Sequence, residues 1–404
     1  MSGPERGPLD ALVALSRWLG GDPELVLAGG GNTSAKLGDR LLVKASGTAL
    51  SEAGPGSFVE LDRKALQALA DRDLGTSRSV REAAFAEALL SARRQPGLGQ
   101  RPSVESVLHH LMPGQFVAHV HANLVNQFAC SGDGRRLIEQ DSREVLWVRY
   151  VDPGFALAQV FQAELRSWRE ATGDKCPTAV VMQNHGLLVS GETLGEVKRR
   201  TTAVLRRLQR IKARACPGKA TGTAATGTAA APLTSSFAPA LAARLARTQE
   251  VAFDSSAPVA ELFASACGRE LALGGPLTPD QIVYCGSLPV WAEQAPGEGT
   301  AALGQRLEVA LREHTERHRT GPTVVLVRPV GLFALAETAH EAETAQTVYL
   351  DAIKVMLGAA CLGGVNYLDE GSRTFIEDWE VEAYRRRVHA GPPRTVPLPK
   401  PTRP

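Results

Sequence analysis

The chain has 404 residues, of which 44% are hydrophobic and 22% charged, and its formal net charge is +2. This length exceeds the usual size of one domain and predicts two domains. The balanced charge and ordinary globular composition argue against a polyanionic partner or a membrane surface, so we expect neither nucleic-acid nor membrane binding.

Secretion and oxidative folding are equally unexpected. The N-terminal segment, MSGPERGPLDALVALSRWLGG, mixes acidic and basic residues and has no uninterrupted apolar core, which is untypical of a signal peptide or a transmembrane helix. The six cysteines are widely spaced and form no CxxC pair. We therefore expect a cytoplasmic protein whose cysteines are reduced thiols.

The first half of the chain alternates predicted helices and strands. Residues 25–47 predict three strands joined by a glycine turn and a tight turn. Further strands are expected at 116–121 and, as a pair, within 178–191. Helical patterns cover 9–18, 62–71, 80–94, 104–112 and 194–212. This alternation predicts a layered α/β/α domain over residues 1–212.

The second half follows a low-complexity stretch at 213–240, which predicts a linker. Beyond it, TVVLVRPVGLFALAETAHEA (323–342) aligns without a gap to TAVVMQNHGLLVSGETLGEV (178–197). Both segments carry Gly-Leu and Glu-Thr-x-x-Glu at the same places, which indicates a duplication. Because His185 aligns with Val330, we interpret 241–388 as a degenerate α/β copy without a site of its own, and 389–404 as a flexible tail.

A pair of histidines marks the first candidate site. In AHVHANLVNQF, the two-residue period of a strand puts His119 and His121 on the same side, a geometry suited to two imidazole ligands of one metal. Buried core histidines are the alternative explanation of the pair alone. The motif QNHG adds His185 at the end of another strand. Three histidines with an open fourth position are typical of a catalytic zinc site.

An acidic residue follows a serine in RPSVESVLHHL. Ser103 is the expected N-cap of the helix predicted at 104–112, and Glu105 lies near the free amide groups at its start. Glu105 could complete the metal sphere or act as a base beside it. A carboxylate that only stabilises the helix is the alternative.

Two glycine turns, GGGNTSAK and KASGT, bring backbone amides and hydroxyl groups together. Glycine lets the backbone approach an anion closely, and Lys44 could neutralise its charge. The spacing fits neither a dinucleotide fingerprint nor a P-loop. Together with Ser103 the turns predict a phosphate cradle, whose side-chain donors are Asn32, Thr33, Ser46 and Thr48.

Five motifs in the first 210 or so residues, GGGNTSAK, VKASGTAL, RPSVE, HVH and QNHG, resemble in order and approximate spacing those of the class II aldolase/adducin family. The second half, including GPLTPDQIVYCGSLPV, is similar to the aldolase portion of bifunctional rhamnulose-phosphate aldolase/short-chain dehydrogenase proteins. No dehydrogenase fingerprint follows in this sequence.

The resemblance implies a divalent metal, usually zinc, held by His119, His121 and His185, with Glu105 as a ligand and the catalytic acid/base. It implies cleavage of a sugar phosphate, a ketose 1-phosphate similar to rhamnulose 1-phosphate. The products are dihydroxyacetone phosphate and an aldehyde, formed through a metal-stabilised enediolate. The residues that match the family's phosphate-binding positions are Asn32, Thr33, Ser46, Gly47 and Ser103.

Several alternatives stay open. Val104 stands where such aldolases often have a second serine, and Ala122 where a small polar residue or proline is common, so an unphosphorylated substrate is possible. Epimerases, dehydratases and decarboxylases of the family share these metal ligands, whereas adducin-like members lack the histidines and act as interaction proteins. Relatives form homo-oligomers in which a neighbouring subunit often supplies the acid. Tyr150, in VRYVDPGFALA, is the candidate acid within this chain, with a packing tyrosine as the alternative.

Overall fold

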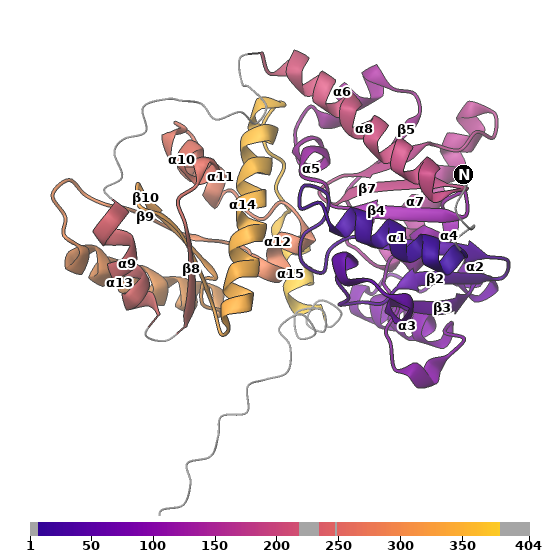
Figure 1. The fold of residues 1–404 in the computed structure, drawn as a ribbon, viewed down its shortest axis with the longest axis horizontal. Helices are drawn as coiled ribbons and strands as arrows, with labels where there is room; N and C mark the ends of the chain where they lie inside the picture. The colour runs from indigo at the N-terminus through magenta and orange to yellow at the C-terminus, as the bar shows by residue number, and fades with distance from the viewer. Residues whose placement is uncertain (1–6, 218–233, 247–248, 380–404) are drawn as a thin grey trace, which may run out of the picture.

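The computed structural model of the protein describes residues 7–217, 234–246 and 249–379. Within these residues the chain forms two α/β units, the first domain (7–217) and the second domain (234–379, without 247–248), which lie side by side in Figure 1. The layered architecture predicted from the sequence is confirmed. No helix in the described ranges has the length and apolar character needed to cross a membrane.

The first domain is built on a mixed sheet. Helices cover both faces of this sheet, so four of its strands (β4, β5, β6 and β7) are buried on both sides. The sheet order is β3 (Phe58–Asp62), β2 (Arg40–Lys44), β1 (Asn32–Leu37), β4 (Phe116–Val120), β7 (Gly186–Gly191), β6 (Ala179–Met182) and β5 (Val145–Val148). One face packs against α1 (Pro8–Gly20), α5 (Asn123–Ala129), α6 (Gly134–Asp141) and α8 (Leu194–Ala215). The other face packs against α2 (Arg63–Ala70), α3 (Arg78–Ser91), α4 (Ser106–Leu111) and α7 (Phe155–Thr172).

The second domain has a smaller sheet with helices on both faces. Its order is β8 (Glu250–Asp254), β11 (Gly331–Ala336), β10 (Val324–Arg328) and β9 (Val290–Glu293). One face packs against α10 (Ala257–Ala264), α11 (Gly268–Leu273), α12 (Pro279–Cys285) and α14 (Ala339–Cys361). The other packs against α9 (Thr234–Leu245) and α13 (Thr300–His318), and α15 (Glu370–Asp378) contacts α12.

The two sheets share one strand pattern, which supports the predicted duplication. The order β4-β7-β6-β5 corresponds to β8-β11-β10-β9, and in both sheets the last pair is parallel and the other pairs antiparallel. The two hairpins pair in the same register, with Val180 opposite Leu188 in the first and Val325 opposite Phe333 in the second.

The helices after these strands correspond as well. Threonine caps α8 and α14, and its side chain accepts a hydrogen bond from the amide of a glutamate three residues later. At Gly134 and Gly268, which begin α6 and α11, an added Cβ would lie 1.9 Å from the carbonyl oxygen six residues earlier. Only glycine fits such a close approach of two backbone segments. Between the first two strands of the copies in chain order, β4 and β5 or β8 and β9, α12 is the helix that the second copy has in addition.

The sequence-predicted boundaries differ from the structure at three places. The expected first strand near residue 25 is instead a turn, in which the amides of Leu25 and Val26 bond to Asp22. Helix α4 begins at Ser106 and not at 104, and Ser103 accepts a hydrogen bond from the Glu105 amide rather than capping the helix. Part of the predicted linker is helical, since α8 ends at Ala215 and α9 begins at Thr234. The rest of that linker, 218–233, and the predicted tail, 389–404, lie outside the described residues.

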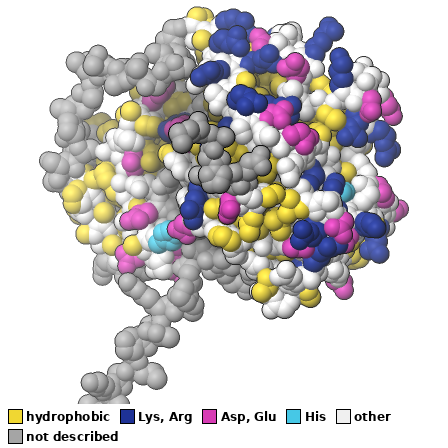
Figure 2. All heavy atoms as spheres, turned by 45° about the vertical axis from the view of Figure 1, so that its right-hand side comes forward, with side chains coloured by type: hydrophobic (Ala, Val, Ile, Leu, Met, Phe, Trp, Pro, Cys, Tyr) yellow, Lys and Arg dark blue, Asp and Glu magenta, His cyan; other side chains and the backbone are white. Residues whose placement is uncertain are grey.

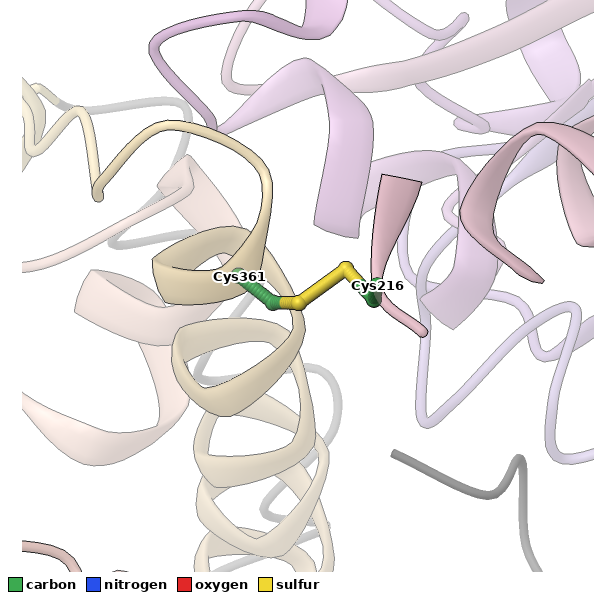
Figure 3. Close-up of a disulfide and its surroundings, with 2 residues drawn as sticks. All are labelled: Cys216 and Cys361. Atoms are coloured by element: carbon green, nitrogen blue, oxygen red, sulfur yellow. A yellow bond between two sulfur atoms is a disulfide. The ribbon is translucent and has the colours of Figure 1, made fainter. Parts of the chain in front are cut away.

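The prediction that all cysteines are free is wrong. Cys216, after α8, and Cys361, at the end of α14, form a disulfide with Cα atoms 6.0 Å apart that joins the two domains (Figure 3). These cysteines are 145 residues apart in sequence, so their spacing did not indicate a disulfide. They meet because α14 packs along the first domain beside α5.

Candidate metal centre

Four predicted metal ligands lie together at one end of the large sheet. His119 is the fourth residue of β4 and His121 follows that strand directly, while His185 precedes the first residue of β7. Strands β4 and β7 are hydrogen-bonded neighbours, so their ends bring the three rings into contact. Glu105 reaches the same point from the segment before α4.

The ligand atoms of these four residues all lie within 4.8 Å of one another. The Nε2 atoms of His119 and His121 are 2.8 Å apart. Glu105 Oε1 is 2.9 Å from Nε2 of His185 and 3.2 Å from Nε2 of His119. Three imidazole nitrogens and one carboxylate are a donor set that suits zinc and related divalent metals.

The hydrogen bonds at the far sides of two rings favour metal binding. His119 Nδ1 lies 3.2 Å from the carbonyl oxygen of Leu187, and His121 Nδ1 contacts the Asp280 carboxylate. Since both partners accept hydrogen bonds, a proton on Nδ1 of each ring would satisfy them and leave each Nε2 free to bind a metal. The four donor atoms converge on one point, and a divalent metal bound there would replace the contacts that they make with one another, so the residues present fit a divalent metal.

The cluster is largely shielded from solvent. His119 exposes 1% of its side chain, His185 8% and Glu105 13%. Burial alone would raise the pKa of Glu105, but the adjacent His119 and His185 outweigh it and hold that pKa well below its usual range. An ionised carboxylate in this position is what a metal ligand requires.

A cavity opens next to the cluster, and five of the predicted substrate-binding residues line it. Glu105, His121 and His185 form part of its wall. Val104, which stands where a serine is frequent in sugar-phosphate aldolases, also faces this space and offers no hydroxyl. The predicted substrate residues along the cavity are Asn32, Lys44, Ser46, Gly47 and Ser103.

Lys44 joins the two predicted glycine turns. Its Nζ donates to the carbonyl oxygens of Gly29, at 3.1 Å, and Thr48, at 2.7 Å, and the residue is 3% exposed. Gly47 has φ +84°, a conformation that favours glycine. The buried ammonium group therefore both fixes the turns and puts a positive charge at the cavity.

Three predicted site residues do not join this group: Thr33, Tyr150 and Thr48, the last of which is not among the residues that line the cavity. The Thr33 hydroxyl is 2.7 Å from that of Ser16 on α1 and does not line the cavity. Tyr150 packs against the apolar cluster of Ile282 and Leu368 at the second domain. Burial raises its pKa to about 12. The structure thus gives Tyr150 the surroundings of a packing residue.

Residues of the second domain also line the cavity, which the sequence did not predict. Pro279 and Asp280, in the first turn of α12, form part of the wall. Thr278 followed by Pro279 is a recognisable helix start. That signal predicts a helix but does not reveal that it faces His121, which is 159 residues earlier.

Comparison with protein families gives two matches. Residues 10–211 match the family described as "Class II Aldolase and Adducin N-terminal domain". Residues 231–385 match the family described as "Aldolase class II, second domain". The two matched ranges cover most of the residues that the structure describes.

Individual relatives are distant. The chain is 22% identical over 414 residues to the "uncharacterized oxidoreductase YuxG" of Bacillus subtilis (strain 168), covering 93% of this chain but only 58% of that protein. A class II aldolase domain from Thermoplasma acidophilum is 27% identical, with a TM-score of 0.44, and covers 52% of this chain and 96% of its own. L-fuculose-1-phosphate aldolase from Thermus thermophilus is 14% identical, with a TM-score of 0.31, and the match covers 50% of this chain and 93% of that one.

Proposed function

Because the chain belongs to the class II aldolase and adducin family, we propose that it is a metal-dependent carbon–carbon lyase that cleaves a ketose 1-phosphate. The products would be dihydroxyacetone phosphate and an aldehyde. The observation that carries this proposal is the convergence of Glu105 and three histidine nitrogens beside a polar cavity. The other members of the donor set are His119, His121 and His185.

When bound, a divalent metal such as zinc would act as a Lewis acid on the substrate carbonyl and offset the negative charge that develops as the carbon–carbon bond breaks. Glu105 is a carboxylate next to this position and at the cavity wall. We assign to it the transfer of a proton to or from the substrate. The shielding of the cluster would strengthen each of these electrostatic interactions.

The cavity supports a phosphorylated substrate. Lys44 supplies a positive charge, Asn32, Ser46 and Ser103 supply polar groups, and Gly47 leaves its backbone accessible. A phosphate oxygen is favoured by such convergent donors. On the face shown in Figure 2, Asp and Glu side chains are interspersed among the Lys and Arg side chains.

A substrate screen tests the proposal. Zinc-loaded protein is incubated with a set of ketose 1-phosphates, and release of dihydroxyacetone phosphate is measured with a coupled reductase. The matching free ketoses test the need for phosphate, and ribulose 5-phosphate tests epimerase chemistry. Cleavage of a ketose 1-phosphate that stops after chelation and returns with zinc is the expected result.

Two results would contradict the proposal. Turnover of ribulose 5-phosphate without cleavage of any ketose 1-phosphate would assign the site to epimerisation. A protein that retains no stoichiometric metal and turns over no sugar would instead be a non-catalytic, adducin-like interaction protein.

A further inference from the structure

Helix α12 of the second domain lies against the metal centre of the first. It is part of the extra segment between α11 and β9, with no counterpart between α6 and β5 among the described residues. The duplication therefore does not account for its presence. Three contacts join the first domain to α12 or to residues of the second domain outside that helix.

The first two contacts fix α12 in place. The side-chain amide of Asn184, the residue before His185, donates to the carbonyl oxygens of Leu277 and Asn366 of the second domain, each at 2.8 Å. The amide of Gly29, in the glycine turn, donates to the Tyr284 hydroxyl at 3.1 Å. Both segments that carry these groups line or border the cavity, so the helix and the site are held as one unit.

The third contact is to a metal ligand itself. The Asp280 carboxylate accepts a hydrogen bond from Nδ1 of His121, whose Nε2 points to His119. Asp280 is 15% exposed. Gly30 makes room for this contact, because a Cβ there would lie 2.8 Å from Oδ2 of Asp280 and 3.2 Å from Nδ1 of His121.

We propose that Asp280 is a positioning residue of the metal site, through which the second domain orients His121. A carboxylate that accepts the Nδ1 proton fixes the ring tautomer and its rotation, and it makes Nε2 a better donor to the metal. Asp280 meets the imidazole at the nitrogen opposite the one that faces the other ligands, so it acts through His121 and not as a ligand. This inference rests on the metal site of the proposed function but not on the reaction assigned to it.

Zinc affinity of the full-length protein tests the proposal. We compare wild type, Asp280→Ala, Asp280→Asn and the control Glu270→Gln, which changes an exposed carboxylate in the first turn of α11. The dissociation constant is measured by competition with a chromophoric chelator. Visible spectra of the cobalt-substituted proteins report the coordination geometry, which a purely structural role of Asp280 would leave unchanged.

We expect Asp280→Ala to weaken zinc binding by about 10- to 100-fold and to change the cobalt spectrum. Asp280→Asn should weaken zinc binding less, because its amide oxygen can still accept a hydrogen bond from Nδ1 of His121. The control should bind zinc like wild type. Unchanged zinc affinity in Asp280→Ala would overturn the proposal, whether or not turnover is lost. Equal losses in the Ala and Asn variants would also overturn it, since the charge and not the hydrogen bond would then matter. Because zinc binding is measured without substrate, failure to cleave any ketose phosphate would not affect this result.

Discussion

The boundary between the two domains contains a partly buried aspartate whose titration should make the stability of the protein depend on pH. Asp351 on α14 accepts a 2.6 Å hydrogen bond from the side-chain amide of Asn123 on α5. Burial raises its pKa from 3.8 to about 7, although the hydrogen bond and the nearby Lys354 oppose this shift. Glu24 and Asp280 add negative charge to its surroundings.

The sign follows from the proton that the folded protein retains. Between about pH 4 and pH 7 folded Asp351 is protonated, whereas the unfolded chain has released this proton, so stability falls as pH rises through this range. Each unit of pKa difference corresponds to about 1.4 kcal/mol. Because the pKa of Asp351 is near 7 in the folded protein, the free energy of unfolding therefore falls by about 3 kcal/mol from pH 5 to pH 8.

Asp351→Asn isolates this contribution, because asparagine stays neutral and its amide oxygen can still accept from Asn123. Urea unfolding of wild type and variant is measured at pH 5 and pH 8 in the same chelator-containing buffer, so that other titrating groups cancel in the difference. We expect the variant to gain about 3 kcal/mol relative to wild type between the two pH values. Glu343→Gln, which alters an exposed carboxylate on the same helix, is the control. An equal stability difference at both pH values would refute the reasoning.

The remaining predictions concern the metal centre and the disulfide. Alanine in place of any one of the three histidines should abolish retention of stoichiometric metal, measured by elemental analysis after gel filtration; wild-type metal content in all three variants would contradict the ligand assignment. Glu105→Gln should keep the fold, seen by circular dichroism, but lower turnover by about 100-fold or more because it removes the proton acceptor; unchanged kinetics would leave Glu105 only a structural role. Thiol titration of denatured, unreduced protein should find four thiols and not six. The disulfide closes a loop of 145 residues, so its loss in Cys361→Ser should lower the free energy of unfolding by up to about 5 kcal/mol. A urea midpoint equal to that of wild type would exclude this contribution.

The sequence was informative about the centre because its ligands lie in short local patterns. The H-x-H spacing puts two imidazoles on one strand face whatever the rest of the fold does. The glycine after His185 marks the start of the neighbouring strand, and Ser103 and Glu105 lie close in sequence. Each pattern is local, and their convergence needed only the pairing of β4 with β7.

The features that the sequence did not reveal depend on contacts between distant segments. Asp280 reaches His121 only because α12 packs on the first domain, and no periodicity encodes such docking. The same holds for Cys216 and Cys361. Thr33 was misplaced for a different reason: side chains on a strand alternate between faces, and its hydroxyl points to Ser16 of α1 while neighbouring Asn32 lines the cavity.

In the second domain, apolar residues stand at the positions of two of the proposed metal ligands, His119 and His185. Phe253 occupies the strand position of His119. His119 pairs with Leu188 and Phe253 pairs with Phe333, and these two partners are at equivalent places in the two hairpins. In the first domain a Cβ on Gly186 would crowd the His119 ring at 3.2 Å. In the second, a Cβ on the equivalent Gly331 would lie 2.4 Å from the Phe253 ring.

Both domains thus have a glycine beside an aromatic ring at this place, but only the first has nitrogen donors there. Val330 replaces His185 and is 3% exposed within an apolar core. Such packing stabilises the smaller sheet, because an unfilled space would forfeit the contacts of its lining. The α12 segment of the second domain places Asp280 beside His121 of the first. Among the described residues, the cluster that could hold a metal lies in the first domain, and the cavity beside it has walls from both domains.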